Sequence, residues 1–287
     1  MIHVDLEALT EMAKSIYRTV HPLLGSSDSG RIVGRGFGGD TTRLIDSVAE
    51  ETVIKYIRDR NIPCIFIGEE NGILRFDEKA DNYLIVDAID GTTNAIRGLK
   101  FTSASLAVAS GDSLKDVKLA AVINLSDGNL YAAEKGKGAW LNGKRIKTSN
   151  ISDLSESIVS IDVSSTPERL EWIIPVMKAA KRIRSLGSTS LEICHVASGI
   201  MDAHIDLRGK IRTLDFAAAM LILRESGGTF GLLDGDEHDE IPLTRLKRFS
   251  IIAAATEELY SQIISKIKMS LSGKFIRSIW NYSTSYD

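Results

Sequence analysis

The stretch YLIVDAIDGTTNA, residues 83–95, joins an apolar segment to two aspartates and a glycine turn. Its first four residues are typical of a short buried strand, which we expect to end at Asp87. Asp90 follows, and Gly91 then opens a turn that leads through Thr92-Thr93 into a short helix. Because Asp87 and Asp90 flank one sharp turn, we expect their side chains to converge. A lone aspartate at a turn most often caps a helix, so a functional interpretation requires further acidic residues at the same place.

Two other segments supply such residues. IPCIFI, residues 62–67, predicts a neighbouring strand that delivers Glu69 at its carboxyl end. In TLDFAAAMLILRESGG, residues 213–228, Thr213 is expected to cap a helix that carries Asp215 in its first turn and ends at the paired glycines. We therefore predict that acidic side chains from distant parts of the chain meet at one site.

These carboxylates predict bound divalent cations. With no lysine or arginine expected between them, they would repel one another and be costly to bury unless a cation neutralised them. Oxygen ligands favour Mg²⁺, Mn²⁺ or Ca²⁺ over zinc, and Mg²⁺ commonly takes a phosphate oxygen as a further ligand. The free N–H groups of the helix that follows Gly91 would attract the same anion. A phosphorylated small molecule is thus the expected substrate.

The predicted order of secondary structure changes near residue 150. Helix periodicity runs from Leu6 to Val20 and again through residues 44–57, and the glycine-rich segment 25–40 between them is expected to form a mobile loop. Residues 101–147 predict an antiparallel meander. After residue 150 strands and helices alternate, and helices are predicted near 189–198, 215–226 and 257–268 and from Thr166-Pro167-Glu168 onward.

We therefore expect an α+β protein with an antiparallel N-terminal sheet and a mixed α/β C-terminal sheet, arranged as two closely packed domains. Residues 1–150 would form the antiparallel half, which carries most metal ligands. Residues 151–287 would form the α/β half, which contributes Asp215 and substrate contacts.

Composition argues against several classes of partner. The 287-residue chain has 44% hydrophobic residues, enough for a large core, and its net charge of −3 leaves no basic excess for nucleic acid or an anionic membrane. The N-terminus is typical of a charged amphipathic helix rather than a signal peptide, and no apolar run is long enough to span a membrane. Cys64 and Cys194 lie in apolar runs and indicate buried free thiols. We expect a cytoplasmic protein without nucleic-acid or membrane partners.

The acidic motifs resemble those of a known family. VDAIDGTTN at residues 86–94, LDFAAAMLILRESGG at 214–228 and IGEEN at 67–71 are similar to the signatures of the magnesium-dependent, lithium-sensitive inositol monophosphatase superfamily, which includes fructose-1,6-bisphosphatases and bisphosphate nucleotidases. The resemblance covers nearly the whole chain. Through GGDTTRLID and DLRGKIRTLD it is strongest to archaeal-type members that hydrolyse both inositol monophosphates and fructose 1,6-bisphosphate. It implies a layered αβαβα sandwich that is usually a homodimer.

The resemblance also implies metal ligands. Glu69, Asp87 and the backbone carbonyl of Ile89 would hold one ion, and Asp87, Asp90 and Asp215 would hold a second. The implied cofactor is Mg²⁺, as two or three ions, with Mn²⁺ as an alternative.

Three further roles follow from the same resemblance. Asp40, on the glycine-rich segment, would help to bind a third ion, but Thr41-Thr42 follows it here where relatives often have a proline. Asp46 would accept a hydrogen bond from the hydroxyl of Thr92 and so help to orient the attacking water. These two residues and the metal ligand Glu69 are the expected catalytic residues.

Substrate contacts are expected at the Gly91 turn, with Thr92 and Thr93, and at basic side chains. Arg208 stands where inositol-specific members have an acidic residue that binds sugar hydroxyls. An arginine there favours a second phosphate or another sugar, because a guanidinium matches phosphate oxygens. Arg184 and Lys135 are the other cationic candidates.

We therefore predict a magnesium-dependent phosphatase of sugar or polyol phosphate monoesters, namely inositol 1-phosphate, fructose 1,6-bisphosphate or both. A metal-activated water would attack in line, without a covalent intermediate. Two alternatives stay open: a 3′(2′),5′-bisphosphate nucleotide phosphatase and a non-catalytic, metal-stabilised binding protein. A binding protein would be expected to lack a metal-ligand position. All four acidic ligands, here called the core carboxylates, are present: Glu69, Asp87, Asp90 and Asp215.

Overall fold

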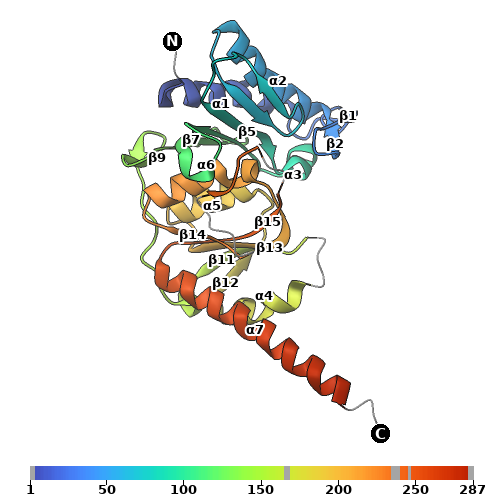
Figure 1. The fold of residues 1–287 in the computed structure, drawn as a ribbon, viewed down its shortest axis with the longest axis vertical. Coiled ribbons are helices and arrows are strands. Elements are labelled where there is room, and N and C mark those ends of the chain that lie inside the picture. The colour runs from blue at the N-terminus through green and yellow to red at the C-terminus, as the bar shows by residue number, and fades with distance from the viewer. Residues whose placement is uncertain (1–3, 165–168, 234–239, 245–246, 284–287) are drawn as a thin grey trace.

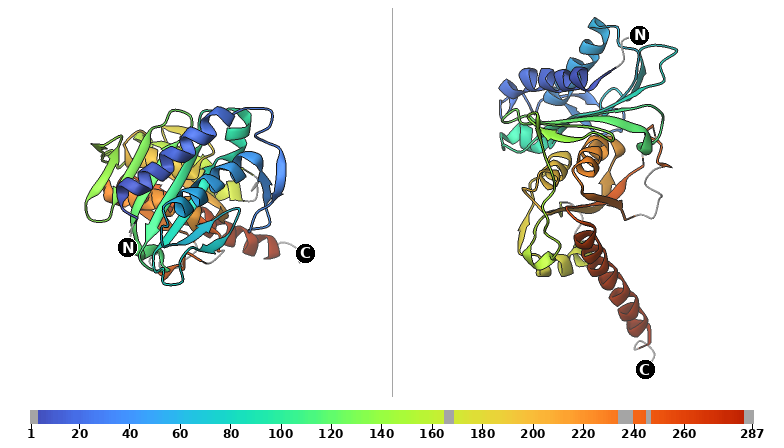
Figure 2. Two further views of the ribbon diagram at one scale, coloured as in Figure 1. Left: turned by 90° about the horizontal axis from the view of Figure 1, so that it is seen from above. Right: turned by 90° about the vertical axis from the view of Figure 1, so that its left-hand side faces the viewer.

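Two large β-sheets and three layers of helices alternate through the molecule (Figures 1 and 2). The structure, a computed structural model, describes residues 4–164, 169–233, 240–244 and 247–283. The helices are α1 (Leu6–Val20), α2 (Leu44–Asp59), α3 (Thr92–Arg97), α4 (Leu170–Ala179), α5 (Thr189–Ala197), α6 (Thr213–Glu225) and α7 (Glu257–Ser283). Helices α1 and α2 cover the outer face of the first sheet, α5 and α6 lie between the sheets, and α4 and α7 cover the far face of the second. This order confirms the predicted α+β sandwich.

The first sheet has eight strands in the order β10-β9-β8-β7-β6-β5-β3-β4. They are β3 (Ile65–Gly68), β4 (Ile73–Arg75), β5 (Tyr83–Asp90), β6 (Ser103–Ala109), β7 (Val117–Asn124), β8 (Leu130–Glu134), β9 (Gly138–Leu141) and β10 (Lys144–Arg145). The strands from β6 to β10 form the predicted antiparallel meander, and β5 pairs antiparallel with β6 at its edge. Strand β3 runs parallel to β5, with Gly68 opposite Val86, so Glu69 follows directly at the same edge as the aspartates of β5.

The sequence predicts that β5 ends at Asp87, but the strand continues to Asp90. Asp87 lies opposite Ser105 and Asp90 opposite Ser103, so β5 has one residue more than β6 between these pairs and forms a bulge. The turn comes later, at Gly91, whose φ of +89° is a conformation that favours glycine. In a regular strand residues three apart face opposite sides, and the bulge allows both aspartates to line one cavity.

The second sheet is mixed, as predicted, with the order β12-β11-β13-β15-β14. Its strands are β11 (Ile158–Asp162), β12 (Arg182–Arg184), β13 (Ala203–Ile211), β14 (Thr229–Leu232) and β15 (Phe249–Ala254). Strand β11 runs parallel to β12 and β13, and β15 pairs antiparallel with β13 and β14. The β11–β13 register places Asp162 opposite Asp206 at the edge nearest the first sheet's acidic turn.

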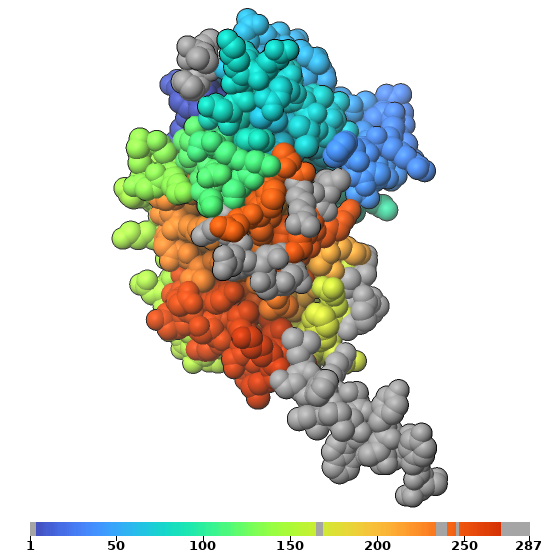
Figure 3. Space-filling view, in the orientation of Figure 1, coloured from blue at the N-terminus to red at the C-terminus, as the bar shows by residue number. Residues whose placement is uncertain are grey.

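A small hairpin lies partly within residues 25–40, where the sequence predicts a mobile loop. Strands β1 (Ile32–Arg35) and β2 (Thr41–Arg43) pair antiparallel, because their β-branched residues suit a strand and Gly39, with φ of +85°, permits the reversal. All four residues of β1 are exposed, and the hairpin projects from one side of the molecule, blue in Figure 3. Asp40 lies at its tip.

Some predicted boundaries need revision. Helix α6 has Arg212 rather than Thr213 at its N-cap, and α7 extends past residue 268 to Ser283. The predicted helix start at Thr166-Pro167-Glu168 lies outside the described residues. Within the described ranges, no helix has both the length and the apolar character needed to cross a bilayer. The division into two domains at residue 150 remains a prediction.

Candidate active site

A cavity of about 290 Å³ opens where the carboxyl ends of β3 and β5 face the N-terminal ends of α5 and α6. Its charged lining consists of five acidic residues, Glu69, Asp87, Asp90, Asp162 and Asp215, and three basic residues, Arg208, Lys210 and Arg212. The excess of two carboxylates makes the wall negative. A cavity of this size suits a small molecule, and the charge would repel a phosphate unless cations were also bound.

Asp87 is a deeply buried carboxylate of the cavity. Only 4% of the residue is exposed, and one carboxylate oxygen, Oδ1, accepts a hydrogen bond of 3.2 Å from the backbone of Ile89. Burial, followed by the nearby Asp90, Glu69 and Asp215, raises the pKa of Asp87 well above its usual value. Its ionised form is therefore costly in the absence of a neutralising cation.

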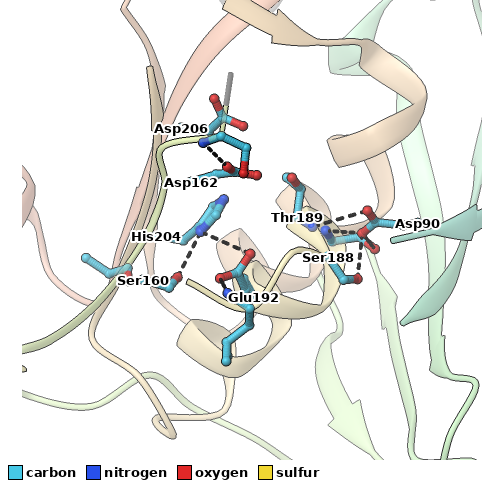
Figure 4. A network of polar contacts seen from close by, with 12 residues as sticks. Asp90, Ser160, Asp162, Ser188, Thr189, Glu192, His204 and Asp206 are labelled. Carbon is cyan, nitrogen blue, oxygen red and sulfur yellow. Dashed lines mark hydrogen bonds and ion pairs between the residues drawn. The ribbon is translucent and has the colours of Figure 1, made fainter. Parts of the chain in front are cut away.

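Asp90 is held by the N-terminal end of α5 (Figure 4). Its Oδ2 accepts hydrogen bonds from the hydroxyl of Ser188 at 2.8 Å and from both the backbone and the hydroxyl of Ser190 at 2.6 Å, while the backbone of Thr189 donates to Oδ1 at 3.2 Å. Burial raises the pKa of Asp90 to about 6 even though these donors oppose the shift. In this conformation Asp90 therefore faces α5.

The turn that follows Glu69 is held by a buried carboxylate on α2. Glu50 is fully buried, and it accepts hydrogen bonds from the backbone of Glu70 at 3.0 Å and from the backbone and side chain of Asn71 at 2.7 and 2.8 Å. A Cβ at Gly68 would lie 2.6 Å from this carboxylate, so glycine is required there. Glu70 itself accepts a hydrogen bond from the hydroxyl of Thr42 on the hairpin.

Arg212 lies among the acidic residues, which corrects the expectation that no basic side chain would do so. Its Nη2 is 2.8 Å from Oε1 of Glu69 and 3.3 Å from Oδ1 of Asp215, and its backbone N–H donates to Oδ2 of Asp215 at 2.8 Å. Burial raises the pKa of Glu69 to about 7, although the guanidinium of Arg212 opposes this. Asp215 thus both caps α6 and pairs with Arg212.

Asp46 and Thr92 meet as the resemblance implied. The Thr92 hydroxyl lies 3.1 Å from Oδ1 of Asp46 and 3.3 Å from the carbonyl of Ile89. Burial raises the pKa of Asp46 to about 6, against the effect of the hydrogen bond from Thr92. Thr92 lines the cavity, so this pair stands beside the acidic cluster.

The other predicted site residues are less central. Asp40 has 63% of its side chain exposed and lies 3.9 Å from Arg212 and 3.7 Å from Arg248. Thr93 and Arg184 are exposed and do not line the cavity, and Arg184 donates to the carbonyl of the preceding residue. Arg208 does line the cavity, as does Gly91.

The donor set fits a hard divalent cation in its chemistry, since it offers only carboxylate and carbonyl oxygens and an excess of buried negative charge. In the conformation described, Arg212 and α5 hold three of the four core carboxylates. Among the described residues, no three acidic, histidine or cysteine side chains converge as a preformed metal site. Glu69 and Asp215 are thus both paired with Arg212 in this conformation.

Sequence reasoning missed Arg212, Glu50 and Asp162. Two of them carried a usable signal. Arg212 lies three residues before Asp215, the spacing of an N-cap and its N3 partner. Glu50 lies on the apolar face of α2, four residues after Asp46 and three before Val53, where an unpaired carboxylate would be costly.

Comparison with known proteins agrees with this geometry. The Inositol monophosphatase family profile matches residues 1–272. A fructose-1,6-bisphosphatase/inositol-1-monophosphatase of Methanothermobacter thermautotrophicus is 36% identical over 267 residues, which cover 90% of this chain and 94% of the relative. A bifunctional NADP phosphatase/NAD kinase of Methanococcus maripaludis is 34% identical over 253 residues, 81% of this chain and 44% of that protein. A crystal structure of an inositol monophosphatase-fructose 1,6 bisphosphatase superimposes with a TM-score of 0.79 at 28% identity and covers 91% of this chain and 98% of its own. Together with the carboxylates gathered at one cavity, the match over nearly the full length shows that this chain belongs to the inositol monophosphatase family.

Proposed function

We propose that the protein is a magnesium-dependent phosphatase that hydrolyses sugar or polyol phosphate monoesters, such as inositol 1-phosphate and fructose 1,6-bisphosphate. The observation that carries this proposal is the meeting of Glu69, Asp87, Asp90 and Asp215 at one cavity beside the Asp46–Thr92 hydrogen bond. Support also comes from relatives named as fructose-1,6-bisphosphatase/inositol-1-monophosphatase, which are similar over most of their length.

The four core carboxylates would hold the Mg²⁺ ions, with the carbonyl of Ile89 as a further ligand, and Asp40 would approach from the hairpin. When bound, such ions make a water molecule more acidic and stabilise charge on phosphoryl oxygens. Two ions would also reverse the negative charge of the cavity wall, which lets a phosphate approach.

The chain's own residues supply orientation. Because Thr92 donates its hydroxyl proton to Asp46, its oxygen remains free to accept a hydrogen bond from the attacking water and to direct it. Asp46 must be ionised for this, and its pKa of about 6 allows that at neutral pH. No side chain needs to form a covalent bond with the phosphoryl group, and we propose direct in-line attack by water.

A nucleotide phosphatase is the second candidate. It is favoured by the 34% identity to the bifunctional NADP phosphatase/NAD kinase, whose name implies a phosphate removed from a nucleotide. A non-catalytic binding protein has less support, because every core carboxylate and the Asp46–Thr92 pair are in place.

A substrate panel tests these proposals. Phosphate release would be measured with inositol 1-phosphate, fructose 1,6-bisphosphate, adenosine 3′,5′-bisphosphate and NADP, in Mg²⁺ and then in EDTA. We expect turnover of the first two, loss of that turnover in EDTA and recovery with added Mg²⁺ or Mn²⁺. Preference for the nucleotides would support the second candidate, and activity undiminished in EDTA would contradict metal dependence.

Two further features belong to the proposal. We propose a cytoplasmic location, in keeping with the two buried free cysteines. We also propose a homodimer, which is usual in the family that the sequence resembles; its mass in solution would test this directly.

A further inference from the structure

One wall of the cavity is formed by Arg208 between two aspartates. Asp206, on the same strand, accepts from Nε and Nη2 of Arg208 at 2.9 and 2.6 Å. Asp162, on the neighbouring strand β11, places Oδ2 3.0 Å from the same Nη2. The parallel pairing of β11 and β13 sets Asp162 directly opposite Asp206, so this arrangement is built into the sheet.

The charge of this group does not suit a second phosphate. One guanidinium is shared by two carboxylates, so the three side chains together carry about one negative charge. The buried His204 and Glu192, drawn below the aspartates in Figure 4, add no cation. Burial lowers the pKa of His204 to about 4 and raises the pKa of Glu192 to about 8, so both are neutral near pH 7. Nε and Nη2 of Arg208 are thus occupied by carboxylates, and an incoming phosphate would also meet the net negative charge of the group.

Asp162 itself is suited to hydroxyl groups. It lines the cavity, 11% of its side chain is exposed, and Arg208 and the backbone N–H of Ser164 hold its two oxygens at 3.0 and 2.9 Å. A carboxylate has about four lone-pair sites, so both oxygens can accept further hydrogen bonds. Asp206 is fully buried and does not line the cavity, which leaves Asp162 as the carboxylate of the pair that a ligand can reach.

We propose that Asp162, held in place by Arg208, binds hydroxyl groups of the polyol part of the substrate and disfavours a second phosphate at that position. This inference rests on the proposed function and narrows it to polyol monophosphates. Arg208 is then a positioning residue, which orients Asp162 rather than binding phosphate.

The test compares Asp162→Ala and Asp162→Asn with Asp153→Ala. Asp153 is a matched control, because its Oδ1 also accepts from the backbone N–H two residues later, at 2.8 Å, but it does not line the cavity. For Asp162→Ala we expect KM for inositol 1-phosphate to rise roughly 10- to 100-fold, the usual effect of losing hydrogen bonds to a charged group. Turnover of p-nitrophenyl phosphate, which has no hydroxyls to bind, should change less than about threefold, and the control should match wild type.

Asp162→Asn keeps the shape but removes the charge. We expect it to shift kcat/KM toward fructose 1,6-bisphosphate relative to inositol 1-phosphate by roughly tenfold or more, a change in ratio that a general structural defect would not produce. Equal losses on all substrates, or an unchanged KM for inositol 1-phosphate, would overturn the proposal.

Calorimetric binding of inositol 1-phosphate separates this inference from the proposed function. Binding that is roughly 10- to 100-fold weaker in Asp162→Ala supports the inference even if no substrate is turned over, in which case the proposed function alone fails. Wild-type binding that is absent, or that Asp162→Ala leaves unchanged, refutes the inference.

Discussion

Replacing Arg212 by methionine removes the guanidinium that neutralises the acidic cluster and keeps much of its apolar length. Nη2 is 2.8 Å from Glu69 and 3.3 Å from Asp215, and only 14% of the Arg212 side chain is exposed. Loss of one partner from a buried ion pair typically costs about 3–5 kcal/mol, because the other charge is left unpaired. Since 26% of the Glu69 side chain is exposed to water, we expect the low end, about 3 kcal/mol.

The loss should depend on pH. Glu69 has a pKa of about 7 in the folded protein, above the unfolded value near 4.3, so its ionisation destabilises the fold as the pH rises between these values. Without Arg212, which lowers this pKa, the cost of ionisation increases. The variant should therefore lose most stability at pH 8 and much less at pH 5, where Glu69 is protonated in both proteins.

Thermal unfolding in EDTA measures this effect. For a chain of this size about 3 kcal/mol corresponds to a fall in Tm of roughly 6–12 °C at pH 8. Arg58→Met is the control, because Arg58 forms an exposed pair with Glu51 at 3.3 Å and its loss should cost less than about 1 kcal/mol. Added Mg²⁺ should raise the Tm of the Arg212 variant more than that of wild type, because the ion no longer competes with the guanidinium. A Tm equal to that of wild type at pH 8, or a loss that is the same at pH 5 and pH 8, would refute this reasoning.

Three other changes have distinct expected results. Asp87→Asn should lower kcat/KM by at least roughly 10³-fold yet raise the Tm in EDTA, because burial and its acidic neighbours make the ionised Asp87 costly; a lower Tm would contradict this. Thr92→Val should lower kcat by roughly 10²- to 10⁴-fold with little change in stability toward urea, and unchanged turnover would remove the proposed role of the Asp46–Thr92 pair. In the wild-type protein, activity should fall below about pH 6 as Asp46 is protonated. Glu50→Ala should reduce the free energy of unfolding by about 2–4 kcal/mol, because the buried N–H groups of residues 70–71 lose their acceptor; Glu50→Gln, which keeps one, should lose less, and equal losses would argue against that cause.

Much of the fold and the acidic site could be predicted from the sequence. Apolar residues recur with the helical period in α1 and α2, and they form short continuous runs in β3 and β5. These patterns predict which residues are buried and whether each segment is a helix or a strand. The acidic motifs could be located because several carboxylates that follow buried strands are not readily explained by helix capping or turn formation alone. Glu69, Asp87, Asp90 and Asp215 do line one cavity in the structure.

Only the tertiary structure determines which residues far apart in the chain contact one another. Periodicity shows that a residue is buried but not what it faces, so neither the bulge that turns Asp90 toward α5 nor the contact of Arg212 with Glu69 could be foreseen. Likewise, Asp162 reaches the cavity only because two parallel strands of the second sheet align it with Asp206. Whether such a carboxylate meets a metal ion, an arginine or a hydroxyl depends on how the sheets and helices pack, because electrostatic neighbours are set by distance in space rather than along the chain.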